Sequence, residues 1–367
     1  MRKIIWLLLL IPILVVCKKK DKKEGPTTPF PSASGSFDQK SLLNAWAQNV
    51  IQVGYKEHYG NLESLENATT SFLSSPSGTT LDGLQAAHHL AYLSWQKVLL
   101  FEFGPAMDHT LSSNSNIYPT DKVEIEKNIA QNLTDLSAAS KLYEKGLPAL
   151  DYLLHHENKD SVIVFFQESA NRRNYLGLVV KDLLGHTGKV KAAWESGYST
   201  SFQNNVGTSA GSGIGLMLNS VNMQFERFVR DGKVGIPSGV RDFNGASLPD
   251  HVEALYRGNV SMELLLASLK GMELWYTGNN TVGLDDYLIN LKATYNGGSL
   301  DEAIKAQFVK CNNAAMAISK PLKEAVLSDK TKVDALYKEL QLLAVLFKVD
   351  VPSALGVVIT YQDNDGD

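Results

Sequence analysis

The spacing of apolar residues is the feature that most constrains the fold of this chain. From residue 37 onward, apolar residues recur at every third or fourth position, and few segments alternate with a period of two. The clearest stripes are Leu81, Leu84, His88, Ala91, Trp95, Val98 and Glu102, and then Val162, Phe165, Ser169, Leu176, Val179 and Leu183. This periodicity predicts an all-α protein.

Further helical patterns are separated by short segments that break helices. Long helices joined by such short connections are typical of helical bundles. The composition changes to Gly, Pro and Asn around residues 237–250, where we place a boundary. We therefore expect two packed helical bundles, formed by residues 37–240 and 241–367. The further patterns cover about 39–72, 123–143, 213–230, 252–275, 300–326 and 333–347, and the breaker segments are 74–78, 118–119, 235–239 and 296–298.

The N-terminal residues have the pattern of an export signal. Arg2 and Lys3 precede an apolar run over residues 4–16, whose 13 residues would span roughly 20 Å as a helix. That length is too short for a bilayer core of about 30 Å, so residues 1–16 are predicted to be a signal peptide. Cys17 follows directly, as in the lipobox of bacterial lipoproteins, and is the predicted lipidation site. The alternative is a cysteine inside an ordinary signal peptide.

The next segment predicts a tether to the membrane. Residues 17–36 are rich in Lys, Pro, Ser and Gly and cannot bury enough apolar surface to fold, so we expect a flexible tether. Its lysines could lie against anionic headgroups and add to the binding by a lipid anchor. The expected location is therefore the bacterial cell envelope, at the outer membrane facing the periplasm or the surface, with the membrane as a partner.

Charge and cysteine content exclude several classes of function. The formal net charge is −4, and residues 1–16 contain two basic and no acidic residues, so their removal leaves −6. A body of this sign argues against nucleic acid as a partner, because phosphates are neutralised by a basic surface. The chain has only two cysteines, Cys17 and Cys311, which exclude a disulfide scaffold and a cysteine-rich metal site.

Acidic residues on apolar stripes are the first candidates for a functional site. Glu102 continues the stripe of His88 and Trp95, and Asp151 shares a helix face with apolar neighbours. Two buried carboxylates on different helices could bind a hard cation or act as an acid–base pair. The alternative is structural: each carboxylate pairs with an arginine, such as Arg172 or Arg173, or caps a helix.

Other polar motifs give weaker indications. Adjacent histidines on a helix, such as His88 and His89, point about 100° apart and do not chelate easily as a pair. The segment 155–157 lies at a predicted helix end, where we expect a solvated turn. The chain has no His-Glu-x-x-His motif, and residues 211–215 lack the pattern of a nucleotide-binding loop. Residues 363–367 carry acids at calcium-like spacing but leave no room for a complete EF-hand loop.

Several of these landmarks together resemble the imelysin-like family of bacterial envelope proteins. Their order along the chain makes the resemblance specific from about residue 40 to residue 367. The landmarks are Trp95 with residues 101–105, Tyr118-Pro119-Thr120-Asp121, residues 146–154, residues 249–253, Gly271, residues 276–278, and residues 355–357 leading into 363–367.

The resemblance implies an all-α fold of two packed bundles that is exported and often lipid-anchored. It also implies a site between the bundles and an association with iron or haem acquisition. Where the family has Gly-x-His-x-x-Glu, this chain has Gly146, Pro148 and Asp151 at the three motif positions. Proline has no imidazole to bind a metal, and aspartate is one methylene shorter than glutamate.

Although this chain lacks the histidine of the family motif, it keeps carboxylates that could supply oxygen ligands. The candidates are Glu102, Asp121, Asp151 and Glu253, a set that favours a hard divalent or iron cation, or no metal at all. The central expectation is that Glu102 and Asp151 meet in the dry seam between the two bundles.

Three functional hypotheses follow. The first is a lipid-anchored binding component linked to iron or haem uptake, whose metal site is degenerate or lost and whose partners include uptake proteins. The second is a metallopeptidase of the imelysin type, which needs a cation with an open coordination position and a general base. The third is a structural or partner-binding lipoprotein in which Glu102 and Asp151 are compensated core acids.

Overall fold

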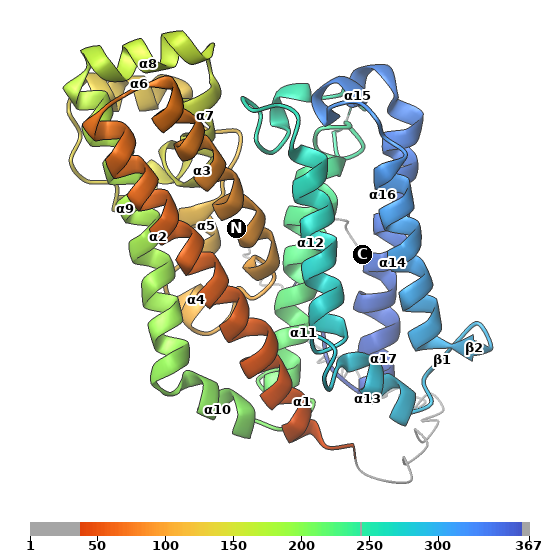
Figure 1. Cartoon of the computed structure of the whole chain (residues 1–367). Coiled ribbons are helices and arrows are strands. Elements are labelled where there is room, and N and C mark those ends of the chain that lie inside the picture. Colours follow the sequence, from red (N-terminus) through yellow and green to blue (C-terminus); the bar gives the residue numbers. More distant parts are fainter. Residues whose placement is uncertain (1–36, 243, 362–367) are drawn as a thin grey trace, which may run out of the picture. The chain divides into compact units, whose positions relative to one another are not determined.

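The computed structural model describes residues 37–242 and 244–361. The predicted signal peptide, Cys17 and the tether, all within residues 1–36, lie outside the described residues, as does the acidic segment 363–367. The described part is predominantly helical, as the periodicity predicted, and its strands are the two of a short hairpin (Figure 1). None of the helices in this part combines the length and apolar character needed to cross a bilayer.

The first group of helices is built around three long ones, α2, α3 and α9. The helix α2 packs against both α3 and α9, and α7 packs on α3 and α9 (Figure 1). In chain order the elements are α1 (Gln39–Ala45), η1 (Trp46–Ile51), α2 (Gln52–Ser74), α3 (Gly78–Val98), α4 (Pro105–Asp108), α5 (Leu111–Ser115), α6 (Lys122–Ala130), η2 (Ala139–Glu144), α7 (Gly146–His155), α8 (Lys159–Glu168), α9 (Ala170–Ala193), η3 (Trp194–Tyr198) and α10 (Ser199–Asn204).

The second group packs around α12, α14 and α16. The helix α14 lies against α12 and α16, and the π-helical segment η4 contacts α12 and α16 (Figure 1). Its elements are α11 (Gly213–Gln224), η4 (Phe225–Gly235), η5 (Pro249–His251), α12 (Ser261–Tyr276), α13 (Leu284–Asn290), β1 (Thr294–Tyr295), β2 (Gly298–Ser299), α14 (Leu300–Met316), α15 (Leu322–Ser328), α16 (Lys330–Val345), η6 (Leu346–Asp350) and α17 (Val351–Leu355).

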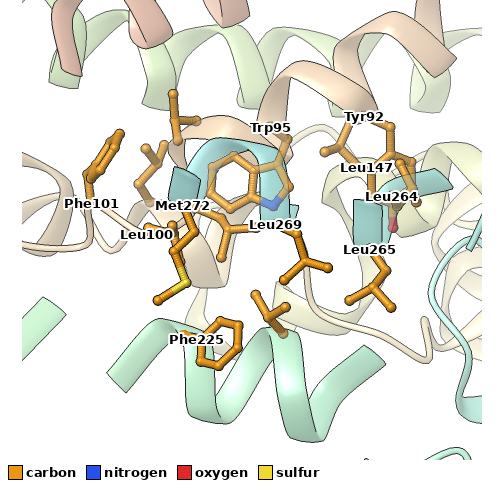
Figure 2. Close-up of a cluster of buried hydrophobic side chains, with 14 of the residues drawn as sticks. Tyr92, Trp95, Leu100, Phe101, Leu147, Phe225, Leu264, Leu265, Leu269 and Met272 are labelled. Atoms are coloured by element: carbon orange, nitrogen blue, oxygen red, sulfur yellow. The ribbon is translucent and has the colours of Figure 1, made fainter. Parts of the chain in front are cut away.

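The two groups share one buried core. The helix α3 of the first group packs directly on α12 of the second. Trp95 of α3 lies among Leu269 and Met272 of α12, with Phe225 of η4 close by (Figure 2). The boundary expected near residue 240 stays a prediction. The segment from α11 to η4 precedes this position in the sequence, but η4 packs on α12 and α16, which follow it.

The segment after the Gly/Pro-rich stretch differs from the expectation. Residues 252–275 were predicted to form a helix, but α12 begins at Ser261. Residues 252–260 form an irregular loop in which Ala254 has φ +53° and Gly258 has φ +75°. Both values lie in the left-handed region, which interrupts an α-helix. This loop carries Glu253, one of the predicted site residues.

The close approach of α3 and α12 gives a test of the fold. A Cβ added at Gly271 would lie 3.0 Å from the Cα of Lys97 and 3.2 Å from the carbonyl oxygen of Gln96. Gly271→Leu should therefore push α12 away from α3 and lower the free energy of unfolding by about 2–3 kcal/mol. Denaturant unfolding followed by circular dichroism measures this change.

The matched control is Gly185→Leu on α9. A Cβ at Gly185 meets nothing within 4 Å, so leucine should raise the free energy of unfolding by about 0.5–1 kcal/mol through helix propensity. Equal effects of the two substitutions would contradict the close packing of α3 on α12.

Candidate functional site

The motif segment forms the start of α7 and is buried. Gly146 opens this helix with φ +78°, and an added Cβ would lie 2.4 Å from the carbonyl oxygen of Ser115. Only glycine fits this position. Pro148 lies in the first turn, where its missing N–H has no intrahelical partner to lose. The first two motif positions, Gly146 and Pro148, therefore have clear structural roles at the start of α7.

Asp151 links α7 to the 252–260 loop by hydrogen bonds. Its side chain is buried, and its two carboxylate oxygens accept the backbone N–H of Tyr256 at 2.8 Å and that of Arg257 at 3.1 Å. Burial raises the pKa of Asp151 to about 7, while these two N–H donors and the Arg257 charge act to lower it. The carboxylate is thus compensated by the protein itself.

Glu253 is the centre of a buried polar network. Its side chain is 1% exposed and its carboxylate accepts hydrogen bonds from Lys233, from Gln96 at 3.1 Å and from Asn116 at 2.7 Å. The Lys233 ammonium also donates to the Gln96 carbonyl oxygen at 2.8 Å, as does the Ser268 hydroxyl at 2.9 Å. Gln96, Asn116, Lys233, Glu253 and Ser268 are called the interbundle network below.

The interbundle network joins the two groups of helices. Gln96 lies on α3 of the first group, whereas Lys233 lies on η4 and Ser268 on α12 of the second. Burial lowers the pKa of Lys233, and the neighbouring Glu253 carboxylate acts in the opposite direction. Among these residues the sequence indicated only Glu253. No apolar run marks Lys233 in the sequence, because Arg230, Asp231 and Gly232 directly precede it.

Glu102 lies at a different place, beside the start of α5. Its carboxylate accepts the backbone N–H of Ser112 at 3.2 Å and the Ser112 hydroxyl at 2.8 Å. Burial raises the pKa of Glu102 to about 7, while the hydrogen bonds from Ser112 act to lower it. The carboxylate of this half-buried acid therefore binds the first turn of α5.

Asp121 caps a helix on the surface. It is exposed, and its carboxylate accepts the backbone N–H groups of Val123 and Glu124, both at 3.0 Å, at the start of α6. Asp121 is therefore the N-terminal cap of α6.

The structure does not assemble the four predicted carboxylates into one group. Asp151 and Glu253 are close enough for the Glu253 charge to raise the pKa of Asp151. Glu102 has its own donors, the backbone N–H and the hydroxyl of Ser112. Across the two described ranges, no set of three His, Cys, Asp or Glu side chains is arranged to hold a metal ion. Glu102 and Asp151 each accept hydrogen bonds from separate donors, and their meeting between the two bundles stays a prediction.

The arginines suggested as partners of these acids have other roles. Arg172 forms an ion pair with Glu126, with 2.5 Å between Nη2 and Oε2. The guanidinium of Arg173 donates to the carbonyl oxygens of Phe166 and Gln167. The donors to Glu102 and Asp151 come instead from serine and from backbone N–H groups.

The comparisons with known proteins agree with this architecture. The family model described as Imelysin matches residues 51–346. An imelysin-like protein from Psychrobacter arcticum has a TM-score of 0.70 at 16% identity, covering 90% of this chain and 100% of that one. A protein from Parabacteroides distasonis assigned as an iron-regulated protein A precursor has a TM-score of 0.72 at 18% identity, covering 89% and 98%. No curated protein matches the chain.

The interbundle network predicts strong coupling between Lys233 and Glu253. Lys233→Met should lower the free energy of unfolding by about 3–5 kcal/mol, because it leaves the Glu253 carboxylate buried without a counter-charge. Glu253→Gln should have a similar effect, and the double variant should lose less than the two single losses together. Denaturant unfolding of the four proteins measures the coupling.

The control is the surface pair of Lys159 and Asp82, which are 2.6 Å apart with both side chains exposed. Lys159→Met should change the free energy of unfolding by no more than about 1 kcal/mol. Additive losses in the Lys233 and Glu253 variants would contradict the proposed coupling.

Stability should also depend on the protonation of His88. This residue is buried, and burial lowers its pKa from 6.5 to about 3, assisted by the nearby charges of His155 and Arg257. The unfolded chain therefore binds more protons between these values, so stability falls as the pH falls from 6.5 towards 3. Between pH 7 and pH 4.5 the His88 contribution to this loss is about 2–3 kcal/mol.

His88→Gln should remove that part of the pH dependence. Unfolding in denaturant at pH 7 and pH 4.5 measures the difference for each protein. Comparing the variant with the parent cancels the opposite contributions of Glu102 and Asp151, whose pKa values are raised. An unchanged dependence on pH in the variant would rule out this role of His88.

Proposed function

Because the chain belongs to the imelysin family, we propose that it is an exported, lipid-anchored binding protein of the bacterial cell envelope that acts in iron acquisition. The proposal places no peptidase chemistry at the motif segment. The observation that argues for binding rather than peptidase chemistry is structural. Pro148 lies in the first turn of α7, and Asp151 accepts two backbone N–H groups of the 252–260 loop.

The residues at the motif positions do not fit the metal that the family motif implies. Pro148 offers no donor atom, and each oxygen of Asp151 already accepts a backbone N–H. A metallopeptidase needs three or so protein ligands, an open coordination position and a general base. We derive no hydrolytic step for this chain, and a binding role accounts better for these residues.

Membrane anchoring is supported by the start of the sequence. Residues 1–16 have the positive start and apolar run of an export signal, and Cys17 follows the apolar run directly. Acylation of Cys17 would provide the anchor, and the lysine-rich tether would add electrostatic attraction to anionic lipids.

The association with iron is supported by a structural relative. The Parabacteroides distasonis protein, which has the same fold over most of this chain, is assigned as an iron-regulated protein A precursor. We propose that this chain likewise supports uptake of iron or haem by binding a component of the uptake apparatus.

The test compares the parent chain with Cys17→Ser in cells that lack the native copy. The parent should be found in the membrane fraction and restore growth when a chelator limits iron. Cys17→Ser should appear in the soluble fraction and restore growth poorly, because the body is no longer held at the membrane. Fractionation with immunoblotting and growth curves measure both effects.

Two outcomes would contradict the proposal. Equal recovery of both proteins in the membrane fraction would exclude anchoring through Cys17. Growth under iron limitation that does not depend on the chain would exclude a role in iron acquisition, leaving a structural or partner-binding lipoprotein.

A further inference from the structure

Segments without charged residues occur in four parts of the sequence. Residues 41–55, 196–225, 274–284 and 351–361 contain no Asp, Glu, Lys, Arg or His. Charged residues make up 20% of the chain, and 20% of the 30 residues in 196–225 would be six. Charged side chains normally cover much of the surface of a folded protein. A surface built from these four segments is therefore unusually poor in charge.

The structure brings these segments together at one end of the helical body. The helix α1 packs against α10, and α13 packs against α17, all four near the same end in Figure 1. Gln39 of α1 donates to the Tyr287 hydroxyl of α13 at 2.9 Å and accepts the backbone N–H of Gly207 at 2.8 Å. Asn49 donates to the Thr281 hydroxyl at 3.0 Å. Residues far apart in the sequence thus form one continuous surface.

The residues that follow α17 complete this surface. Asn219 of α11 donates to the carbonyl oxygen of Val358 at 3.0 Å, and its own amide oxygen accepts the backbone N–H of Thr360 at 2.6 Å. The surface formed by α1, α10, α13, α17 and the loops 205–212, 277–283 and 356–361 is called the tether-side surface below.

Three exposed apolar side chains lie on the tether-side surface. Val206 in the 205–212 loop is 50% exposed, Ile289 on α13 is 54% exposed and Val358 is 63% exposed. Both signs of charge occur at the border of this surface, so neither sign dominates there. The border residues include Asp38 and Lys40 at the start of α1, and Asp286 and Lys292 on and just after α13.

Exposed apolar residues at the other end of the body have charged neighbours instead. Figure 1 shows α6, α8 and α15 at the end opposite α1 and α13. Val123 of α6 is 68% exposed, and it lies between Lys122 and Glu124 in the sequence. Val164 of α8 and Leu327 of α15 are exposed as well. A surface with apolar side chains and few charges is therefore a feature of one end of the body.

The place where the chain enters the body indicates what the tether-side surface faces. Phe37 is the first described residue, and its ring stacks on Tyr287 of α13 with 4.3 Å between the ring centroids. The predicted tether, residues 17–36, is joined to the body at this point. As a flexible chain its 20 residues would span roughly 25 Å, whereas the helical run over residues 39–74 is about 54 Å long. A lipid anchor at Cys17 would therefore keep this end, rather than the opposite one, close to the bilayer.

We propose that the tether-side surface binds the bilayer to which Cys17 anchors the chain, with Val206, Ile289 and Val358 among the lipid headgroups. This inference rests on the lipid anchoring in the proposed function and is independent of the role in iron acquisition. A surface without charges loses little hydration at the membrane interface, and its exposed apolar side chains are stabilised there. Each contact is weak, but a tether raises the effective concentration of the partner to about the millimolar range.

The test compares amide hydrogen exchange in the anchored and the free protein. The chain from Cys17 onward is coupled through the Cys17 thiol to a maleimide lipid in phosphatidylcholine vesicles. The free sample has this thiol blocked with N-ethylmaleimide and is mixed with vesicles that lack the maleimide lipid. Cys311 does not react in either sample, because it is buried and burial raises its pKa to about 12.

Anchoring should slow exchange only on the tether-side surface. Mass spectrometry should show exchange at least about twofold slower in peptides from residues 205–212 and 356–361 of the anchored protein. Exchange in residues 131–138, which follow α6 at the other end of the body, should not change.

The triple variant Val206→Asp/Ile289→Asp/Val358→Asp tests the apolar contact. It should lose the slower exchange on anchoring, because a carboxylate has to stay hydrated and keeps the surface away from the lipid. The three positions are at least half exposed, so the substitutions should leave the fold intact. Circular dichroism checks the fold.

The matched control is the triple variant Val123→Asp/Val164→Asp/Leu327→Asp at the opposite end. These side chains are also exposed, by 68%, 42% and 66%, and the same number of negative charges is added. This variant should show the slower exchange of the parent when it is anchored.

Vesicles that contain phosphatidylglycerol separate this contact from attraction by the tether lysines. Contact through an uncharged surface should occur on both kinds of vesicle, whereas attraction by lysines needs anionic lipid and falls with salt. The proposal is overturned if anchoring leaves exchange on the tether-side surface unchanged, which would indicate a protein partner there instead. It is also overturned if exchange slows only on anionic vesicles, or if the variant at positions 206, 289 and 358 behaves as the parent does. Because the anchor is attached chemically, these results are independent of whether Cys17 is acylated in cells.

Discussion

The buried ion pair between Lys233 and Glu253 is the interaction on which the arrangement of the helices depends. Both side chains are almost completely buried, so each charge is tolerable only while the other is present. Gln96 contacts both partners, donating to Glu253 and accepting from Lys233. Because Gln96 lies on α3 and Lys233 on η4, separating the two groups of helices would leave charged and amide groups unpaired. The apolar contact of α3 with α12 and this polar network therefore act on the same interface.

The sequence predicted the helices well because their periodicity is a local property. The pattern over residues 39–72 corresponds to the continuous run from α1 through η1 to α2. The same reasoning failed at residues 131–138, which follow the end of α6, and at residues 252–260, where the apolar spacing also suited a helix. The backbone N–H groups of Tyr256 and Arg257 donate to Asp151 of α7. A side chain about 100 positions earlier in the sequence thus decides the conformation, and tertiary contacts of this kind override local propensity.

The candidate site was predictable only in part, for a similar reason. A carboxylate on an apolar stripe indicates burial, and Asp151 is indeed buried. What compensates the charge cannot be read from the stripe, because the donors to Asp151 are backbone groups of a distant loop. The sequence also drew attention to Pro148 and Asp151 but not to Gln96 or Lys233, since neither belongs to a motif with a known chemistry.

The arrangement around the 252–260 loop shows why buried acids here do not by themselves indicate a metal. Asp151 and Glu253 lie close enough for one to raise the pKa of the other, a situation in which a cation would ordinarily supply the missing positive charge. In this chain the Lys233 ammonium and two backbone N–H groups supply that compensation.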